Sequence, residues 1–273
     1  MRQPFQDSKL ATVLICLTIF LPSSFLPSSR AAAEDAKSKD ARPKSISVCF
    51  LGNSYTRYNN LPGLVKAMAA TQGIKMEIAA STPNGFQLSQ HLKEKKSLDT
   101  LKSRKWDYVV MQEQSQKPAV FPKEFGKSVW QLAQIASAQG TKTVLYMTWE
   151  REKKPDMAPK LSYAYIAAGD ATSAKVAPVG IAWNYLRKTR PKLSLYKGDG
   201  SHPNRNGTYL AAATICARIC DIDPMKFPNT VPMGNKPYSI PAEAATPIKK
   251  AAAEAVLLEK KRTSGRRPTP SGS

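Results

Sequence analysis

Near-continuous apolar runs alternate with segments of helical periodicity through the middle of the chain. The apolar runs predict strands at residues 46–52 ("ISVCFLG"), 75–81, 106–112 ("WDYVVMQ"), 141–149 and 175–182. Apolar residues at intervals of about three to four predict helices at 61–73, 86–96, 124–140, 160–174, 183–191 and 206–221. Strands of this kind are typical of a sheet covered on both faces. We therefore predict a single α/β domain, a three-layer, doubly wound (flavodoxin-like) parallel sheet with helices on both faces.

The two ends of the chain differ from this pattern. Arg2 and Lys9 precede a twelve-residue apolar run, "LATVLICLTIFL", which is short for a membrane span, and Ala31–Ala33 offers a small-residue cleavage site. We predict a signal peptide over 1–33, a linker over 34–44 and the folded domain over 45–228. Residues 229–273 are expected to form a C-terminal extension, a short helix followed by a disordered basic tail. The protein is then exported, periplasmic or secreted, with no integral membrane span after cleavage. An uncleaved N-terminal anchor is the alternative.

The chain carries 41 Lys and Arg against 20 Asp and Glu, a net charge of +21. Such a charge could favour nucleic acid, an anionic membrane surface or an acidic polysaccharide. The basic residues are spread along the chain, with local clusters at 93–96, 151–154 and 260–267, and no nucleic-acid-binding motif accompanies them. We therefore expect no nucleic-acid partner. A surface that tolerates or attracts an anionic cell-envelope polymer is the milder interpretation.

Cysteine usage indicates neither a disulfide framework nor a metal site. Without Cys16, which lies in the predicted signal peptide, the chain has Cys49, Cys216 and Cys220, an odd number. Cys216 and Cys220 are four residues apart in a predicted helix, where bridge geometry is poor. No Cys-x-x-Cys spacing occurs. These cysteines are expected to be small buried apolar residues, and we expect no metal.

Polar residues follow several of the predicted strands directly. Ser54 follows the first strand, 112–115 ("QEQS") follows "YVVM", and 148–152 ("TWERE") follows "VLYM". In doubly wound sheets ligands bind outside the carboxyl ends of the strands, so these residues should gather at one edge. The segment "LGNSYTRYNN" lacks the glycine spacing and the lysine of a phosphate-binding loop.

The chain has only two histidines, His91 and His202. His202 lies in "GDGSHPNRNGTYLAA", three residues after Asp199, ahead of a predicted helix. An Asp-x-x-His loop lets a carboxylate orient the imidazole while its other nitrogen accepts a proton, which a serine nucleophile such as Ser54 requires. The alternative is a surface turn whose polar residues only cap the next helix. His91 is expected on the exposed face of a helix.

Taken together, "FLGNSYT" and "DGSHPNRNGTYLAA" resemble the first and last sequence blocks of the SGNH (GDSL-like) hydrolase superfamily. The resemblance covers roughly residues 45–225. It implies Ser54 as nucleophile, His202 as general base and Asp199 as the residue that orients it. It also implies an oxyanion hole with the backbone amides of Ser54 and Gly85. Where the family has Gly-x-Asn-Asp, this chain has "QEQS", so the third donor is Gln112 or Gln114, and we favour Gln114.

The resemblance implies an exported serine esterase that removes acyl groups, with acetyl favoured, from a carbohydrate or similar polar substrate, without a cofactor. The partner is then a small-molecule or polysaccharide acyl ester, and the oligomeric state is open. The alternatives are a non-catalytic carbohydrate-binding or envelope-associated module and a polysaccharide O-acyltransferase. No Gly-x-Ser-x-Gly elbow of an α/β-hydrolase occurs.

Further polar and aromatic residues have weaker interpretations. A carboxylate pair for glycoside cleavage could come from Glu113, Glu150 and Glu152 at predicted strand ends. The residues Tyr55, Tyr58, Asn59 and Asn60 either line a rim beside Ser54 or cap the following helix. An apolar stripe is expected to belong to the core rather than to a cofactor site: Trp130, Leu132, Ile135 and Ala136.

Overall fold

The computed structural model describes residues 44–265 of the chain. The predicted signal peptide (1–33), all but the last residue of the predicted linker and residues 266–273 of the predicted basic tail lie outside the described residues. None of the helices in the described part of the chain is long and apolar enough to cross a membrane.

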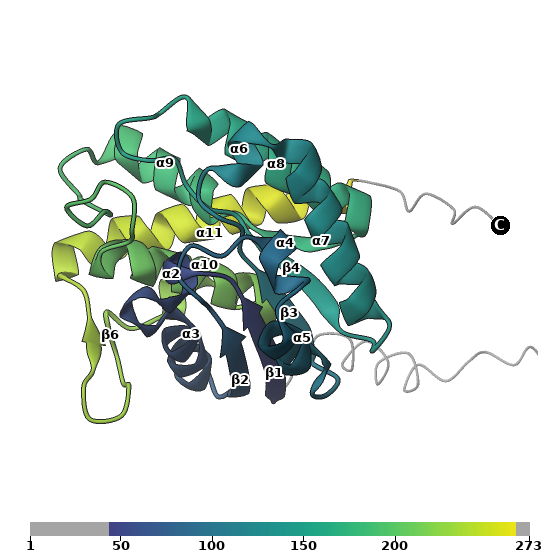
Figure 1. Ribbon diagram of the computed structural model, residues 1–273. Helices are drawn as coiled ribbons and strands as arrows, with labels where there is room; N and C mark the ends of the chain where they lie inside the picture. The colour runs from purple at the N-terminus through teal and green to yellow at the C-terminus, as the bar shows by residue number, and fades with distance from the viewer. Residues whose placement is uncertain (1–43, 266–273) are drawn as a thin grey trace, which may run out of the picture. The chain divides into compact units, whose positions relative to one another are not determined.

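A five-stranded, fully parallel sheet with the order β2-β1-β3-β4-β5 forms the centre of the fold (Figure 1). This is the flavodoxin-like order, so the predicted doubly wound α/β fold is confirmed. The two halves of the sheet grow outward from β1 and β3, which pair with each other. The strands are β1 (Ser45–Leu51), β2 (Lys75–Ser81), β3 (Tyr108–Met111), β4 (Lys142–Tyr146) and β5 (Lys175–Ala177).

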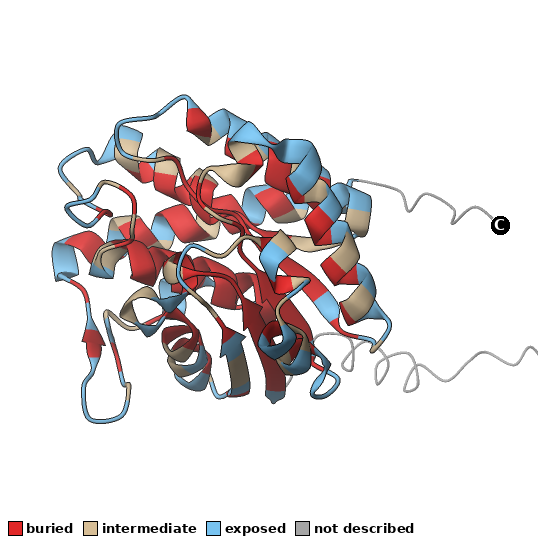
Figure 2. Ribbon diagram, viewed as in Figure 1, coloured by how far each residue is buried: buried red, intermediate tan, exposed pale blue. Residues whose placement is uncertain are grey.

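Both faces of the central strands β1, β3 and β4 are buried, as the red strands in Figure 2 show, whereas the edge strand β2 is only partly buried. Along β1, Ile46, Val48 and Phe50 face one hydrophobic cluster, and Cys49 and Leu51 face the other. Because successive side chains of a strand point to opposite faces, both sets must be apolar when both faces are covered. That requirement explains the unbroken apolar run in the sequence.

Two sets of helices cover the two faces of the sheet. The first cluster is closed by α3 (Leu61–Ala70), α9 (Val179–Thr189), α10 (Arg205–Cys220) and α11 (Ala242–Ser264). The second is closed by α5 (Lys95–Lys102), α7 (Pro122–Ser137) and α8 (Met157–Thr172). The shorter elements are α2 (Ser54–Arg57), η1 (Tyr58–Asn60), α4 (Leu88–His91), α6 (Lys117–Val120), η2 (Pro224–Lys226), β6 (Thr230–Val231) and β7 (Tyr238–Ser239).

Most predicted elements differ from the structure by a few residues at their ends, and two of them differ in kind over part of their length. The helix predicted over 86–96 is divided into α4 and α5, because the side chain of Glu94 accepts hydrogen bonds from the amides of Lys96 and Ser97 and starts a new helix there. The strand predicted over 175–182 ends at Ala177. Pro178 follows as the N-cap of α9, so Val179 and Ile181 are helical and not part of a strand.

The C-terminal part of the chain also differs from the expected short surface helix. Helix α11 is 23 residues long and lies against α9 and α10. It buries Ile248 together with a series of alanines in the first cluster, and Val256 is buried as well. Alanine permits close approach of helices, and α10 offers its own run of buried alanines at 211–213. Residues 242–256 therefore contribute to the core of the domain.

The three cysteines agree with the sequence-based expectation, whereas one residue of the predicted apolar stripe does not. The three cysteines in the described residues, Cys49, Cys216 and Cys220, are buried and unpaired by disulfides. Trp130 is a correction to the predicted core stripe, because 53% of its surface is exposed whereas Leu132 and Ala136 are buried. It lies on the outer face of α7, one position away from the buried Val129.

Candidate active site

The carboxyl ends of four neighbouring strands bring polar residues to one pocket. Ser54 follows β1, Gly85 follows β2, Gln114 follows β3 and Arg151 follows β4, and all four line the pocket. His202, from the loop before α10, lines it too. The expected gathering of strand-end residues at one edge of the sheet is therefore observed, in the place where doubly wound folds bind ligands.

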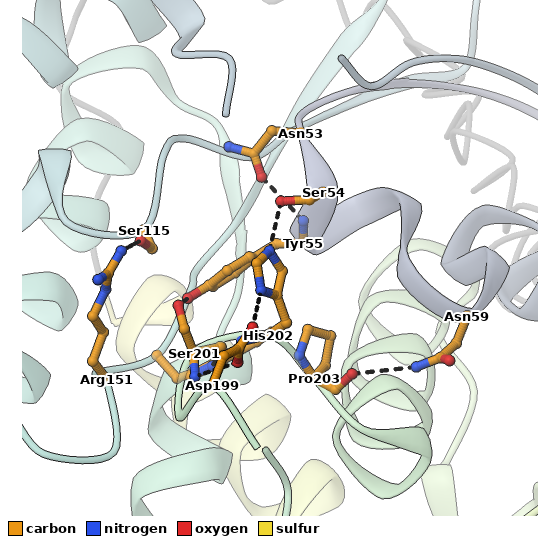
Figure 3. A network of polar contacts seen from close by, with 11 residues as sticks. Asn53, Ser54, Tyr55, Asn59, Ser115, Arg151, Asp199, Ser201, His202 and Pro203 are labelled. Carbon is orange, nitrogen blue, oxygen red and sulfur yellow. Dashed lines mark hydrogen bonds and ion pairs between the residues drawn. The ribbon is translucent and has the colours of Figure 1, made fainter. Parts of the chain in front are cut away.

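Ser54, His202 and Asp199 form one hydrogen-bonded chain (Figure 3). The Ser54 Oγ lies 2.8 Å from the His202 Nε2, and the His202 Nδ1 lies 2.5 Å from the Asp199 Oδ2. With Nδ1 protonated and donating to the carboxylate, Nε2 is the nitrogen that can accept the serine proton. The geometry is that of a nucleophile, a base and a residue that orients the base.

The loop of Asp199 is held by its own backbone. The second carboxylate oxygen of Asp199 accepts hydrogen bonds from the amides of Ser201 and His202, both at 2.9 Å. Partial burial raises the pKa of Asp199, but the hydrogen bonds from the His202 ring and from these two amides outweigh it and lower the pKa to about 2. The carboxylate therefore stays charged at neutral pH.

The Ser54 segment is fixed from several sides. The Asn53 side chain accepts from the Tyr55 amide and donates to the Phe86 carbonyl at 2.8 Å, which joins it to the loop that carries Gly85. The Tyr55 hydroxyl lies 2.6 Å from the Ser201 Oγ, next to His202 in sequence. The two sides of the Ser54–His202 hydrogen bond are thus tied together independently of that bond.

Of the residues considered for the rim or for capping, Tyr58 takes the first role, Asn60 takes the second, and Asn59 takes neither. Tyr58 lines the pocket, and its ring lies 4.5 Å from the His202 ring. Asn59 donates to the Thr208 Oγ1 at 2.8 Å, which joins the Ser54 segment to α10. Asn60 has a φ of 52° and caps α3 through the Gly63 amide.

The two candidate glutamines have different surroundings. The Gln112 carboxamide is fully buried: its oxygen accepts from the Asn53 amide and the Thr56 hydroxyl, and its nitrogen donates to the Glu113 carbonyl. Gln112 therefore does not line the pocket, and its expected alternative role as an oxyanion donor has no geometric support. Gln114 does line the pocket. The Gln114 oxygen accepts from the Gln116 and Lys117 amides, which leaves its Nε2 as the atom that can donate.

The candidate oxyanion-hole amides have no other function in the fold. Within residues 44–265, the backbone amides of Ser54 and Gly85 have no protein acceptor. Gly85 has a φ of 69°, in the left-handed region that glycine adopts readily, and the space at its Cα is open. No side chain at position 85 would therefore prevent a ligand bound beside Ser54 from approaching the Gly85 backbone.

The carboxylates considered for glycoside cleavage do not face this pocket. Glu113 is fully buried, with one oxygen accepting from the Leu88 and Gln114 amides. Glu150 is also fully buried and pairs with Arg187 at 2.7 Å. Neither these two residues nor Glu152 lines the pocket. These three glutamates therefore do not form a carboxylate pair at the pocket.

His91 is a correction to the sequence-based expectation of a surface residue. Its ring is fully buried, with the Nε2 2.9 Å from the Gly52 carbonyl oxygen and the Nδ1 2.7 Å from the Ser97 Oγ. Burial lowers the pKa of His91. The ring is therefore neutral, donates to Gly52 and supports the end of β1 from beneath Ser54.

Arg57 and Arg151 both line the pocket, although neither was predicted as a site residue. The only available signal for Arg151 is its position after the fourth strand, in "TWERE".

The pocket has a volume of about 350 Å³ and no aliphatic lining side chain. In the described part of the chain, no group of three or more His, Cys, Asp or Glu residues could hold a metal ion.

No protein-family model and no curated protein matches this sequence. Solved structures do match it. A protein from Slackia heliotrinireducens, titled as a candidate SGNH hydrolase, is 29% identical over 64% of this chain and 99% of its own, with a TM-score of 0.56. A DUF4886 family protein from Bacteroides uniformis is 20% identical over 78% of this chain and 95% of its own, with a TM-score of 0.64.

A third similar structure is a mutant of Axe2, an acetyl-xylooligosaccharide esterase from Geobacillus stearothermophilus. It is 14% identical, covers 64% of this chain and 94% of its own, and has a TM-score of 0.52. At 20% and 14% identity, the Bacteroides and Geobacillus proteins show a common fold alone. The protein thus has the α/β fold of SGNH hydrolases, with Ser54, His202 and Asp199 at the carboxyl edge of its sheet.

Proposed function

We propose that this protein is an SGNH-type serine esterase that hydrolyses short acyl esters, acetyl esters foremost, of a carbohydrate or similarly polar alcohol. The observation that carries the proposal is the hydrogen-bonded chain from the Ser54 hydroxyl through His202 to Asp199, at 2.8 and 2.5 Å. The 29% identical SGNH-type structure supports the same reaction class.

The reaction follows from the positions of the three side chains. The Ser54 Oγ attacks the ester carbonyl carbon while the His202 Nε2 accepts the hydroxyl proton. His202 then delivers that proton to the oxygen of the leaving alcohol, and the acyl group remains on Ser54. In the second half, water attacks the acyl-enzyme with His202 again as base, and the acid is released. Asp199 keeps the imidazole in the productive tautomer and stabilises its charged form.

The developing oxyanion is proposed to receive three hydrogen bonds. The donors are the backbone amides of Ser54 and Gly85 and the side-chain nitrogen of Gln114. In support, both amides lack an acceptor within the described residues, and the Gln114 oxygen is already engaged by two backbone amides. The loss of one such donor typically lowers turnover by about 10²- to 10³-fold.

The lack of aliphatic side chains in the pocket lining supports a short acyl group, and the hydrogen-bonding side chains there support a polar alcohol. A long acyl chain gains binding free energy by burying apolar surface, about 0.8 kcal/mol per methylene. Asn, Ser, Tyr, Arg, Gln and His side chains line the pocket, together with Gly85. They can donate and accept hydrogen bonds to hydroxyl groups but offer no aliphatic channel. We also propose that the protein acts outside the cytoplasm, on the basis of the N-terminal sequence pattern.

The test is hydrolysis of 4-nitrophenyl acetate and of an acetylated sugar by the purified protein, with Ser54→Ala and His202→Ala. We expect both variants to lose activity and Ser54→Ala to lose labelling by a fluorophosphonate. Ser103→Ala, which removes an exposed serine after α5, is the matched control and should retain both.

Three outcomes separate the alternatives. Full activity in a folded Ser54→Ala or His202→Ala protein would refute the esterase. Sugar binding without turnover or labelling would support the non-catalytic module. Acetylated polymer formed in excess of free acetate would support an acyltransferase.

A further inference from the structure

The pocket carries a positive charge that no carboxylate neutralises. Of its lining residues, Arg57 and Arg151 are cationic and none is acidic, since Asp199 lies behind the His202 ring. The Arg57 guanidinium is exposed and donates to the Asn84 side chain at 2.5 Å. Arg151 is partly buried and lies beside Ser115 (Figure 3).

Arg151 has few hydrogen bonds for a shielded guanidinium. Its Nη2 lies 3.3 Å from the Ser115 Oγ, and its Nε is buried without any hydrogen-bond partner. Two other partly shielded arginines of the described chain each pair with a carboxylate, whereas the buried Arg218 donates to the Val176 carbonyl oxygen. Arg187 pairs with Glu150 at 2.7 Å and Arg262 with Glu259 at 2.7 Å. The buried Nε is out of reach of a ligand, but within the described residues the Nη1 has no protein acceptor and the Nη2 has only the Ser115 hydroxyl, so these two nitrogens are available to a group from outside the protein.

The backbone around Arg151 is fixed on both sides. The Glu150 carbonyl accepts from the Tyr196 hydroxyl at 2.8 Å, and the Glu152 amide donates to the Gly200 carbonyl at 2.8 Å. The carboxylate of Glu150 faces Arg187 instead of Arg151. The side chain of Arg151 is therefore presented to the pocket by a rigid loop whose two acidic residues are engaged elsewhere or excluded from the pocket.

We propose that Arg151 forms a carboxylate-binding subsite, so that the preferred substrate is an ester that carries a carboxylate near the scissile bond. This rests on the proposed esterase function and names its substrate class. A planar guanidinium can bind a carboxylate with two parallel hydrogen bonds, whereas a neutral sugar hydroxyl cannot use both donors in this way. The carboxylate is either on the alcohol, as in an acetylated uronic acid, or on the acyl group, as in a dicarboxylic half-ester.

The experiment compares kcat/KM within two matched pairs of esters. Acetylated glucuronic acid against acetylated glucose tests a carboxylate on the alcohol. The 4-nitrophenyl half-ester of succinic acid against 4-nitrophenyl butyrate tests a carboxylate on the acyl group. We expect the wild-type protein to prefer the charged member of one pair by at least about tenfold, a value typical of one charge-assisted interaction. The pair that shows the preference identifies the position of the carboxylate.

Variants assign that preference to Arg151. Arg151→Met should lower the charged-to-neutral ratio of kcat/KM by about tenfold or more, and Arg151→Lys, which keeps the charge but loses the planar fork, should retain an intermediate ratio. Lys153→Met removes an exposed charge from the same loop, outside the pocket, and should leave the ratio unchanged. Circular dichroism and thermal melting establish that each variant is folded.

Wild-type ratios near one in both pairs, or a ratio that Arg151→Met leaves unchanged, would overturn the subsite while leaving the esterase intact. If no ester is hydrolysed, the esterase fails, and calorimetric binding of glucuronate and succinate to Ser54→Ala decides the subsite separately. Binding that Arg151→Met weakens by at least about tenfold supports it. Equal binding by both proteins, or no binding by either, refutes it.

Discussion

The Glu113→Gln variant should become more stable relative to the wild type as the pH rises. The Glu113 side chain is fully buried. Its Oε1 accepts from the Leu88 amide at 3.1 Å and from the Gln114 amide at 2.7 Å, while its Oε2 has no partner. Glutamine has nearly the same shape, and its carbonyl oxygen can accept from both amides.

The magnitude follows from the ionisation of the carboxyl. Burial raises the pKa of Glu113 from 4.5 to about 7, against the opposing effects of the two amides and of Lys117. The unfolded chain ionises near the ordinary value, so the folded wild type loses stability as pH rises from about 4.5 to about 7. Since one pH unit corresponds to about 1.4 kcal/mol, the full loss is about 3 kcal/mol. A neutral glutamine has no such loss.

The measurement is the free energy of unfolding in urea, for both proteins, at several pH values between about 4 and 9. The difference between variant and wild type removes the titration of all other groups. It should rise by about 3 kcal/mol across this window, mostly between about pH 5 and 7, and remain level above it. Glu124→Gln, an exposed glutamate on α7, is the control and should show no such rise.

A flat difference for Glu113→Gln would refute the assignment of a raised pKa to this buried carboxyl. A difference that falls with pH would mean that the charged form is favoured by the fold, which the unpartnered Oε2 argues against. Loss of esterase activity in a stable variant would instead indicate that the charge on Glu113 matters for the position of Gln114.

Three further predictions follow from the site and its support. Asp199→Asn should lower kcat by about 10²- to 10⁴-fold; a mild loss would contradict the proposed role of Asp199 in orienting His202. The wild-type pH profile should show no titration of Asp199 above about pH 4, because hydrogen bonds hold its pKa at about 2. 4-Nitrophenyl octanoate should be hydrolysed with a kcat/KM at least about tenfold below that of the acetate, since the pocket has no aliphatic lining, and equal values would contradict a short-acyl site. Gly207→Ala should lower the free energy of unfolding by about 1–3 kcal/mol, because its Cβ would lie 2.4 Å from both the Leu195 carbonyl oxygen and a Trp183 ring carbon; an unchanged melting temperature would refute this close packing.

The sheet could be predicted from the sequence because both of its faces are buried. Val48 and Cys49 point to opposite faces and are both apolar, so the pattern identifies the strand and its environment together. Helix α11 gave no comparable signal. Its buried face is made mostly of alanine, which contributes little apolar contrast against its lysines and glutamates. The side that is covered becomes evident only from the helices packed on it, α9 and α10. Short-range patterns do not contain that information.

The candidate site was predictable where sequence neighbours share a loop and less so where the fold decides direction. Asp199 and His202 are three residues apart, and their contact follows from a tight turn. Gln112 and Gln114 both follow β3. They are two positions apart, so the alternation of side chains along an extended strand does not distinguish which of them faces the pocket. The deciding contacts come from Asn53 and Thr56, nearly sixty residues earlier, which hold Gln112 inside. Arg151 likewise becomes a candidate for substrate binding only from the structure, which shows that no carboxylate of the described residues pairs with it.

The two histidines of the chain support the same short segment in different ways. The neutral ring of His91 donates to the Gly52 carbonyl from within the core, and the His202 ring accepts from the Ser54 hydroxyl at the pocket. Gly52 is itself closely packed, because a Cβ there would lie 2.4 Å from the Thr56 hydroxyl oxygen. The end of β1 therefore has little freedom to move when, in the proposed reaction, Ser54 changes from hydroxyl to acyl ester. Such a fixed nucleophile keeps the oxyanion donors in place between the two halves of the reaction, since reorganising them would add to both barriers.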